Sequence, residues 1–167
     1  KLTSTQVGGI STAQIQGITT DQAKLLTVTQ AAGLTSAQLA KLDPEDFAKL
    51  SATTVAALTS SQINGITPDQ VATLSTAQFA VLTATQLSSL GTDDIQAITE
   101  THAAMLTSSQ ISGLSSSQIR ALELSDQQLL STAVIAGLSN AQLAGLSPQQ
   151  ISDLTTAQVK ALTSSQV

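Results

Sequence analysis

Leucine or isoleucine stands at every eighth position of the chain, from Leu2 to Leu162, at all 21 of the 21 positions that this spacing allows. If these residues are numbered position one of an octad, a second hydrophobic site follows at position six. Position six is apolar in 20 octads and polar at Gln127. A fixed short period is typical of repeat proteins, in which each unit packs on its neighbours. The pattern therefore predicts a repeat architecture built from octads.

The polar positions of the octad predict a short helix. Position two is Ser or Thr in 18 octads, and position five is Gln in 15. In the octad that begins at Leu58, Thr59 is placed to cap the helix and Gln62 to complete a capping box, while Leu58 and Ile63 form the hydrophobic staple. Seven of the nine glycines stand at position eight, as Gly65 does. We expect them to end the helix in the left-handed conformation.

Prolines and charges support the same helix. The three prolines all stand at position three, the first helical residue, where proline removes no hydrogen bond. Ten of the 11 acids stand at positions two to five, near the helix start, and five of the six bases at positions seven or eight. A continuous helix would turn positions one and six about 140° apart, and a flat strand would place them on opposite faces. Both alternatives are therefore disfavoured.

An octad cannot fold alone, because isolated helices shorter than about 12 residues are marginal. We expect an all-α solenoid of one- to two-turn helices, forming one elongated rod over residues 1–167 as a segment of a longer array. Two octads per coil is the simplest arrangement, with three as the alternative. The octad Leu122–Leu129 lacks both the Ser/Thr cap and the apolar position six. It is therefore expected to be a local irregularity or bend.

The composition narrows the function classes. Aromatic residues make up 1% of the chain and charged residues 10%, the formal net charge is −5, and cysteine is absent. The few basic residues are scattered, which disfavours nucleic acid as a partner. The apolar runs are far shorter than the roughly 20 residues of a transmembrane helix, so we expect no membrane insertion. No phosphate-binding loop or Ser-His-Asp set can be assembled, and an enzyme is not expected.

Two groups of side chains have the composition of a metal site. His102, the single histidine, stands at position five one octad after Asp94, and Asp43, Glu45 and Asp46 lie within four residues of one another. His102 is interpreted as a polar replacement for the usual Gln, and on opposite sides of a two-octad coil it would not reach Asp94. The acids are interpreted as favourable charges at a helix start. The sequence therefore predicts no catalytic, cofactor-binding or metal-binding residues, and no cofactor.

The octads resemble a known class of arrays. The run Leu106–Leu114, with its variants Leu74–Phe79 and Leu154–Val159, is similar to the L-T-x-x-Q-[ILV]-x-x-L octapeptides of very large bacterial surface and secreted proteins, often described as adhesin-like. The resemblance implies an extracellular or cell-surface stalk, spacer or fibre segment. Its expected partners are further copies of itself, end to end or laterally, or flanking domains of the same polypeptide. The alternative is a binding module whose regular Ser, Thr and Gln rows recognise a partner protein, a glycan or ice.

Overall fold

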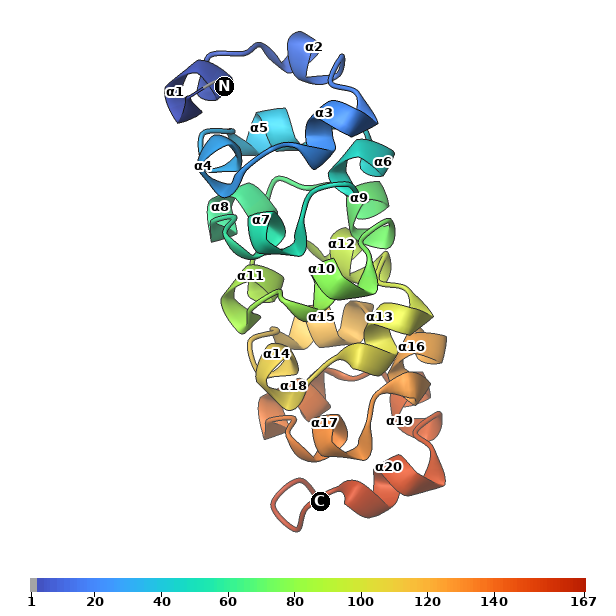
Figure 1. Cartoon of the computed structure of the whole chain (residues 1–167). Helices are drawn as coiled ribbons and strands as arrows, with labels where there is room; N and C mark the ends of the chain where they lie inside the picture. The colour runs from blue at the N-terminus through green and yellow to red at the C-terminus, as the bar shows by residue number, and fades with distance from the viewer. Residues whose placement is uncertain (1–2) are drawn as a thin grey trace. The chain divides into compact units, whose positions relative to one another are not determined.

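The computed structural model describes residues 3–167, so Leu2, the first residue at position one, lies outside the described residues. The chain divides into two compact units, Lys1–Leu82 and Thr83–Val167. Each described unit consists of very short helices, one in each octad up to α20 (Figure 1). The all-α solenoid with one short helix per octad is thereby confirmed.

The helices are four to six residues long. The first unit contains α1 (Ser4–Gly8), α2 (Thr12–Ile15), α3 (Thr20–Lys24), α4 (Val28–Ala31), α5 (Ser36–Leu39), α6 (Pro44–Phe47), α7 (Ala52–Ala56), α8 (Ser60–Ile63), α9 (Pro68–Ala72) and α10 (Thr76–Ala80). The second contains α11 (Ala84–Ser88), α12 (Thr92–Gln96), α13 (Glu100–Met105), α14 (Ser108–Ile111), α15 (Ser116–Ala121), α16 (Leu124–Leu129), α17 (Thr132–Ala136), α18 (Asn140–Gly145), α19 (Pro148–Ser152) and α20 (Thr156–Ala161).

The start of each typical helix is fixed by the predicted capping box. At α8, the N-cap Thr59 has the extended conformation, with φ −71° and ψ 159°. Its Oγ1 accepts a hydrogen bond from the Gln62 amide at 3.3 Å, and the Thr59 amide donates to Gln62 Oε1 at 2.9 Å. Two backbone N–H groups that a helix start leaves unpaired are satisfied in this way. The same reciprocal pair recurs in every described helix whose third residue is Gln.

The predicted left-handed helix ends are wrong, since no glycine among residues 3–167 has a positive φ. The chain instead leaves the helix through a tightened last turn, in which the amides of Gly65 and Ile66 donate three residues back at 3.1 and 3.2 Å. At some position-eight glycines there is no space for a Cβ. A Cβ on Gly65 would overlap Ser36 of the preceding coil, and one on Gly113 would lie 2.6 Å from the carbonyl oxygen of Ala84.

This close approach predicts opposite effects for two Gly→Ala substitutions at the same octad position. Gly113→Ala should lower the free energy of unfolding by about 1–3 kcal/mol, because the Cβ has to displace the Ala84 backbone. Gly17→Ala should be neutral or stabilising by up to about 1 kcal/mol, since the nearest neighbour of its Cβ, Gln14 O, lies 3.4 Å away. Urea denaturation followed by circular dichroism measures both. Equal effects of the two substitutions would refute the steric explanation.

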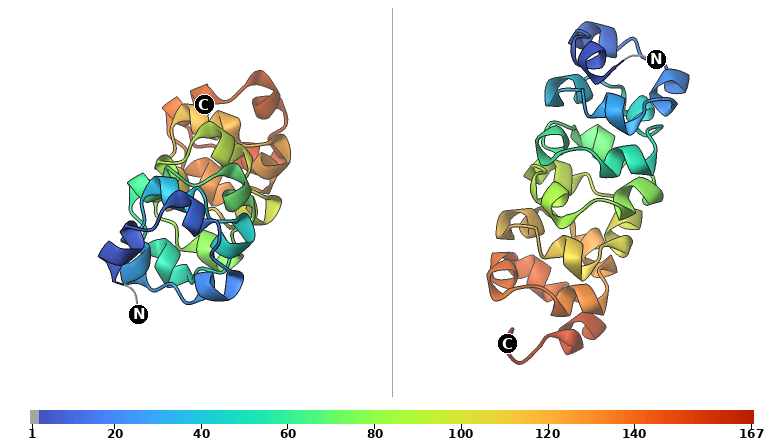
Figure 2. Two further views of the ribbon diagram at one scale, coloured as in Figure 1. Left: turned by 90° about the horizontal axis from the view of Figure 1, so that it is seen from above. Right: turned by 60° about the vertical axis from the view of Figure 1, so that its left-hand side comes forward.

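The coil closes after three octads, which corrects the expectation of two. In the first unit α1 packs on α4, α2 on α5 and α3 on α6, and in the second α11 packs on α14, α12 on α15 and α13 on α16. The views of Figure 2 show this stacking of short helices in the blue-to-green first unit. Position one stands directly before each N-cap, and position six is the fourth residue of each helix. A coil of three octads encloses the side chains of both positions.

The hydrophobic positions fill the inside of each coil. Phe47, Leu39 and Phe79 at position six of the first unit are fully buried, as are Leu87 and Ile95 in the second. Position one is buried from Leu34 onward to Leu138. No helix in residues 3–167 has the length and apolar character that crossing a membrane requires.

Candidate functional site

A row of buried glutamine amides is the main polar feature of the inside of the solenoid. Nine of the glutamines at position five accept a hydrogen bond from their own cap and use the other end of the amide to reach the preceding coil. The acceptors are backbone carbonyls 28 to 31 residues earlier in the chain. In the described residues, such links are made by Gln38, Gln62, Gln70 and Gln78 of the first unit and by Gln118, Gln142, Gln150, Gln158 and Gln166 of the second. We call this row the glutamine ladder.

Gln70 shows the geometry of one link. Its side chain is fully buried, and its Nε2 donates to Leu39 O at 2.8 Å and Leu42 O at 2.7 Å. Its Oε1 accepts from the Thr67 amide at 3.0 Å. One primary amide thus satisfies three backbone groups where water is excluded. Sequence reasoning identified the bond to the cap and missed the bonds between coils.

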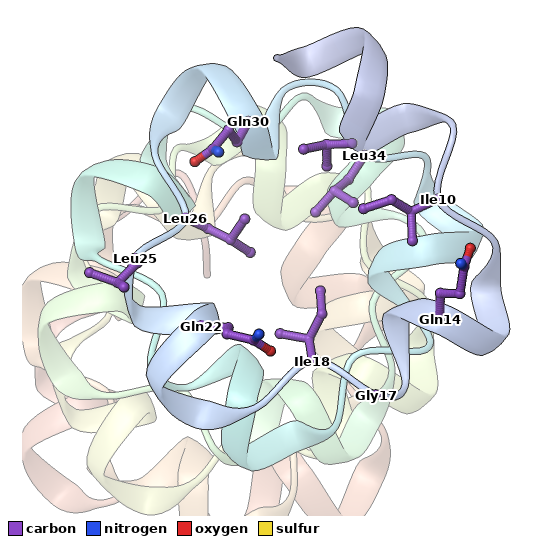
Figure 3. Close-up of a pocket in the computed structure, with 10 residues that line it drawn as sticks. Ile10, Gln14, Gly17, Ile18, Gln22, Leu25, Leu26, Gln30 and Leu34 are labelled. Carbon is purple, nitrogen blue, oxygen red and sulfur yellow. The ribbon is translucent and has the colours of Figure 1, made fainter. Parts of the chain in front are cut away.

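The first coil contains a pocket of about 470 Å³. Figure 3 shows Ile10, Ile18 and Leu26, all at position one, directed toward the middle of the ring that this coil forms. Gln14 and Gln22 also line the pocket, and their Oε1 atoms accept from their own caps at 2.9 Å. The lining is therefore made of ordinary octad positions, apolar in the middle and carrying amides at the rim. It contains no titratable side chain.

The structure places His102 and Asp94 in the role of the usual glutamine, as predicted for His102. His102 is buried, its backbone amide donates to Thr99 Oγ1 at 3.3 Å, and its Nδ1 accepts from the Thr99 amide at 3.4 Å. Asp94 Oδ2 accepts from the Gly91 amide at 2.8 Å. Burial raises the pKa of Asp94 above its ordinary value, although the Gly91 amide opposes the shift. The two side chains bond to separate caps on consecutive helices, α12 and α13.

The acids around Pro44 are also used locally. Asp43 is the N-cap of α6, and its Oδ1 accepts from the Glu45 amide at 3.0 Å. Asp46 stands at position five and is buried, and this burial, together with the charges of Asp43 and Glu45, raises its pKa. Within residues 3–167, no group of three His, Cys, Asp or Glu side chains has the arrangement to hold a metal ion.

The octad Leu122–Leu129 differs from the others in its hydrogen bonds. Its N-cap Glu123 makes no side-chain cap bond, while its backbone, with φ −64° and ψ 154°, stays in the range of the other caps. Asp126 and Gln127 are both 2% exposed. Among the described side chains, Asp126 Oδ2 and Gln127 Oε1 are the buried polar atoms without a hydrogen-bond partner. The octad is therefore irregular in its hydrogen bonds, whereas its backbone at the cap is regular; the bend expected here stays a prediction.

The pKa of Asp126 is raised to about 6. Burial is the main cause, since it disfavours the charged carboxylate, and the negative charges of Glu123 and Glu100 add to it. Gln127 occupies the hydrophobic position six, where its Nε2 donates to Gln150 O. Sequence reasoning identified the octad as exceptional but did not identify Asp126 as a buried acid.

Two Ser hydroxyls at position three form hydrogen bonds between coils. Ser108 Oγ donates to Ala133 O at 2.9 Å and Ser116 Oγ donates to Ala141 O at 2.7 Å. The glutamines of the ladder, apart from Gln166, are buried. A binding face built on Ser, Thr and Gln rows would therefore have to rely on the hydroxyls that remain at the surface.

Comparison with known proteins supports the repeat. The family model of the ALTTAQ repeat matches residues 39–76 and 119–156, so the chain is similar to that repeat in two regions. No curated protein matches the sequence. The chain is thus a repetitive helical repeat protein, and the comparisons assign no activity or partner.

Proposed function

We propose that this chain is a structural repeat segment, a stalk or spacer in a bacterial extracellular or cell-surface protein. The observation that carries the proposal is the glutamine ladder, because within each unit it joins a coil to the coil before it through hydrogen bonds of one repeating kind. The hydrophobic core is continuous within each unit. An architecture of this kind sets length by the number of coils rather than presenting a shaped site.

The surface location and the partners follow from the same proposal. The resemblance to octapeptide arrays of large surface and secreted proteins supports an extracellular setting, and the lack of cysteine is compatible with it. The partners of a spacer are further repeats or flanking domains of the same polypeptide. A fibre-forming segment would instead associate with further copies of itself, and the two roles differ in how particle length depends on concentration.

The test removes one whole coil. Deleting Leu58–Val81 takes out three octads and joins Ala57 to Leu82, which preserves the octad register. The variant should remain folded, and its longest dimension in small-angle X-ray scattering should shorten by about 8–10 Å, the usual spacing of packed helices. The matched control deletes Leu58–Ala77, which breaks the register and should lose cooperative unfolding. A folded deletion variant with the same longest dimension as the parent would contradict a spacer.

Concentration distinguishes the spacer from the fibre. A spacer should keep one scattering length over a wide concentration range, whereas a fibre-forming segment should lengthen as concentration rises. Electron microscopy of the same samples would show discrete particles in the first case and filaments in the second.

A further inference from the structure

Asp126 stands at the octad position that holds a glutamine in most octads of the second unit. At the same octad position, Gln118 donates to Leu87 O and Leu90 O, and Gln142 donates to Ile111 O and Leu114 O. These acceptors lie 31 and 28 residues before the glutamine. The same register places the carbonyls of Ile95 and Ile98 opposite Asp126. An ionised carboxylate has no proton to donate to them.

The surroundings of Asp126 favour its neutral form. Its Oδ2 is buried without a partner, and the side chain is 2% exposed. Glu123, at the cap of the same helix, and Glu100, in the first turn of the facing helix α13, both disfavour a further negative charge. A protonated carboxyl has one O–H donor and keeps an acceptor oxygen, which is the donor–acceptor pair that a glutamine amide supplies.

The other titratable groups around α16 complete the electrostatic setting. They are His102 on α13, Arg120 in the last turn of α15, Asp153 at the end of α19 and Lys160 on α20. Helix α17, which follows α16 in the chain, carries no charged residue. The acids Glu123 and Glu100 are the groups whose charges act on Asp126 in addition to burial.

We propose that the octad Leu122–Leu129 is a pH-sensitive joint of the solenoid, which the neutral Asp126 carboxyl closes by hydrogen bonding to the preceding coil and which its ionised form loosens. The joint goes beyond the spacer role, because it makes the stability of this coil respond to acidity. It also gives a reason why the cap, the ladder amide and the apolar position six are all absent from this octad.

The direction of the pH dependence follows from proton linkage. The pKa of Asp126 is about 6 in the folded protein against 3.8 for an ordinary aspartic acid. The folded state therefore binds the proton more tightly than the unfolded chain. The stability of the joint is highest when the pH is below the ordinary pKa of 3.8. It falls as the pH rises toward about 6 and is constant at the lower level above that pH.

The experiment compares the parent with Asp126→Gln, which restores the ladder amide. Amide hydrogen exchange in α13 and α16 is corrected for the intrinsic pH dependence of exchange. The protection factors of the parent should fall between about pH 4 and about pH 6 and stay level up to about pH 7.5, whereas those of the variant should stay constant throughout. The melting temperature of Asp126→Gln should exceed that of the parent by about 5 °C at the higher pH. Carbon NMR of the Asp126 carboxyl in the parent should titrate with a midpoint near 6.

Two further variants keep the proposal falsifiable. Asp126→Asn removes the charge without adding length and should also abolish the pH dependence at α16, which covers the case in which Asp126→Gln fails to fold. Asp69→Asn changes an exposed acid of α9 and should leave the pH dependence at α16 as it is in the parent. Protection at α16 that responds to pH equally in the parent and in both Asp126 variants would overturn the proposal. An Asp126 that titrates near its ordinary value in the folded protein would overturn it as well.

Discussion

Gln70→Leu is expected to lower the free energy of unfolding of the first unit by about 3 kcal/mol. Leucine has nearly the volume of glutamine and fills the same space, so the loss comes from hydrogen bonding rather than from a cavity. The Nε2 donations to Leu39 O and Leu42 O disappear, as does the bond from the Thr67 amide to Oε1. Each buried group left without a partner costs about 1–3 kcal/mol, and the apolar side chain recovers part of the sum.

The matched control for this substitution is Gln22→Leu, at the same octad position in the first coil. Gln22 is exposed, and its Oε1 accepts from the Thr19 amide at 2.9 Å. Water can replace that bond, so the expected loss is about 0.5 kcal/mol. Urea denaturation of both variants, followed by circular dichroism, measures the difference. If the two substitutions had equal effects, the glutamine ladder would contribute nothing beyond the capping box.

The helices were predictable because the signals that form them are local. A Thr cap, a Gln three residues later and apolar residues on either side define a short helix within one octad, as at Thr59 and Gln62. The number of octads per coil depends on contacts between residues that are far apart in the chain. Since every octad carries nearly the same pattern, the sequence has no longer sub-period that would distinguish two octads per coil from three.

The glutamine ladder did leave a signal in the sequence. A capping box accepts either Glu or Gln at its third helical position. Position five of this chain holds 15 Gln and no Glu. Selection for a cap alone would not exclude Glu, whereas donation to two buried carbonyls requires an amide. Three of the six exceptions at this position are the buried acids Asp46, Asp94 and Asp126, and in all three burial raises the pKa.

The role of glycine was not predictable from the octad, because it depends on the neighbouring coil. Position eight suggests a left-handed helix end, but Gly9 ends α1 with φ −82°. At Gly65 and Gly145 a Cβ would meet Ser36 and Ser116, which lie 29 residues earlier. Thr73 stands at the same octad position and uses its hydroxyl there, donating to Pro44 O at 3.1 Å. Only the closed coil shows which of these sites are crowded.

Ile111→Ala is expected to lower the free energy of unfolding of the second unit by about 3 kcal/mol. Ile111 stands at position six of α14 and is fully buried. Truncation removes three carbon atoms from a site enclosed by the coil, and the loss combines the transfer free energy of those atoms with the cost of the cavity. The hydrogen bond from the Gln142 side-chain Nε2 to the backbone Ile111 O, 2.8 Å long, is left in place. The substitution therefore tests hydrophobic packing separately from the ladder.

Ile151→Ala supplies the matched control, with the same residue at the same octad position of the same unit. Ile151 is 47% exposed, so its truncation leaves no enclosed cavity and should cost about 1 kcal/mol or less. Denaturation of the two variants under one set of conditions compares the loss of a buried isoleucine with the loss of an exposed one. Nearly equal losses would mean that the hydrophobic ladder stabilises each octad by itself. A threefold difference would mean that a position-six side chain stabilises the fold mainly where a neighbouring coil covers it. Dependence on a neighbouring coil is the physical basis of cooperative stacking in this array.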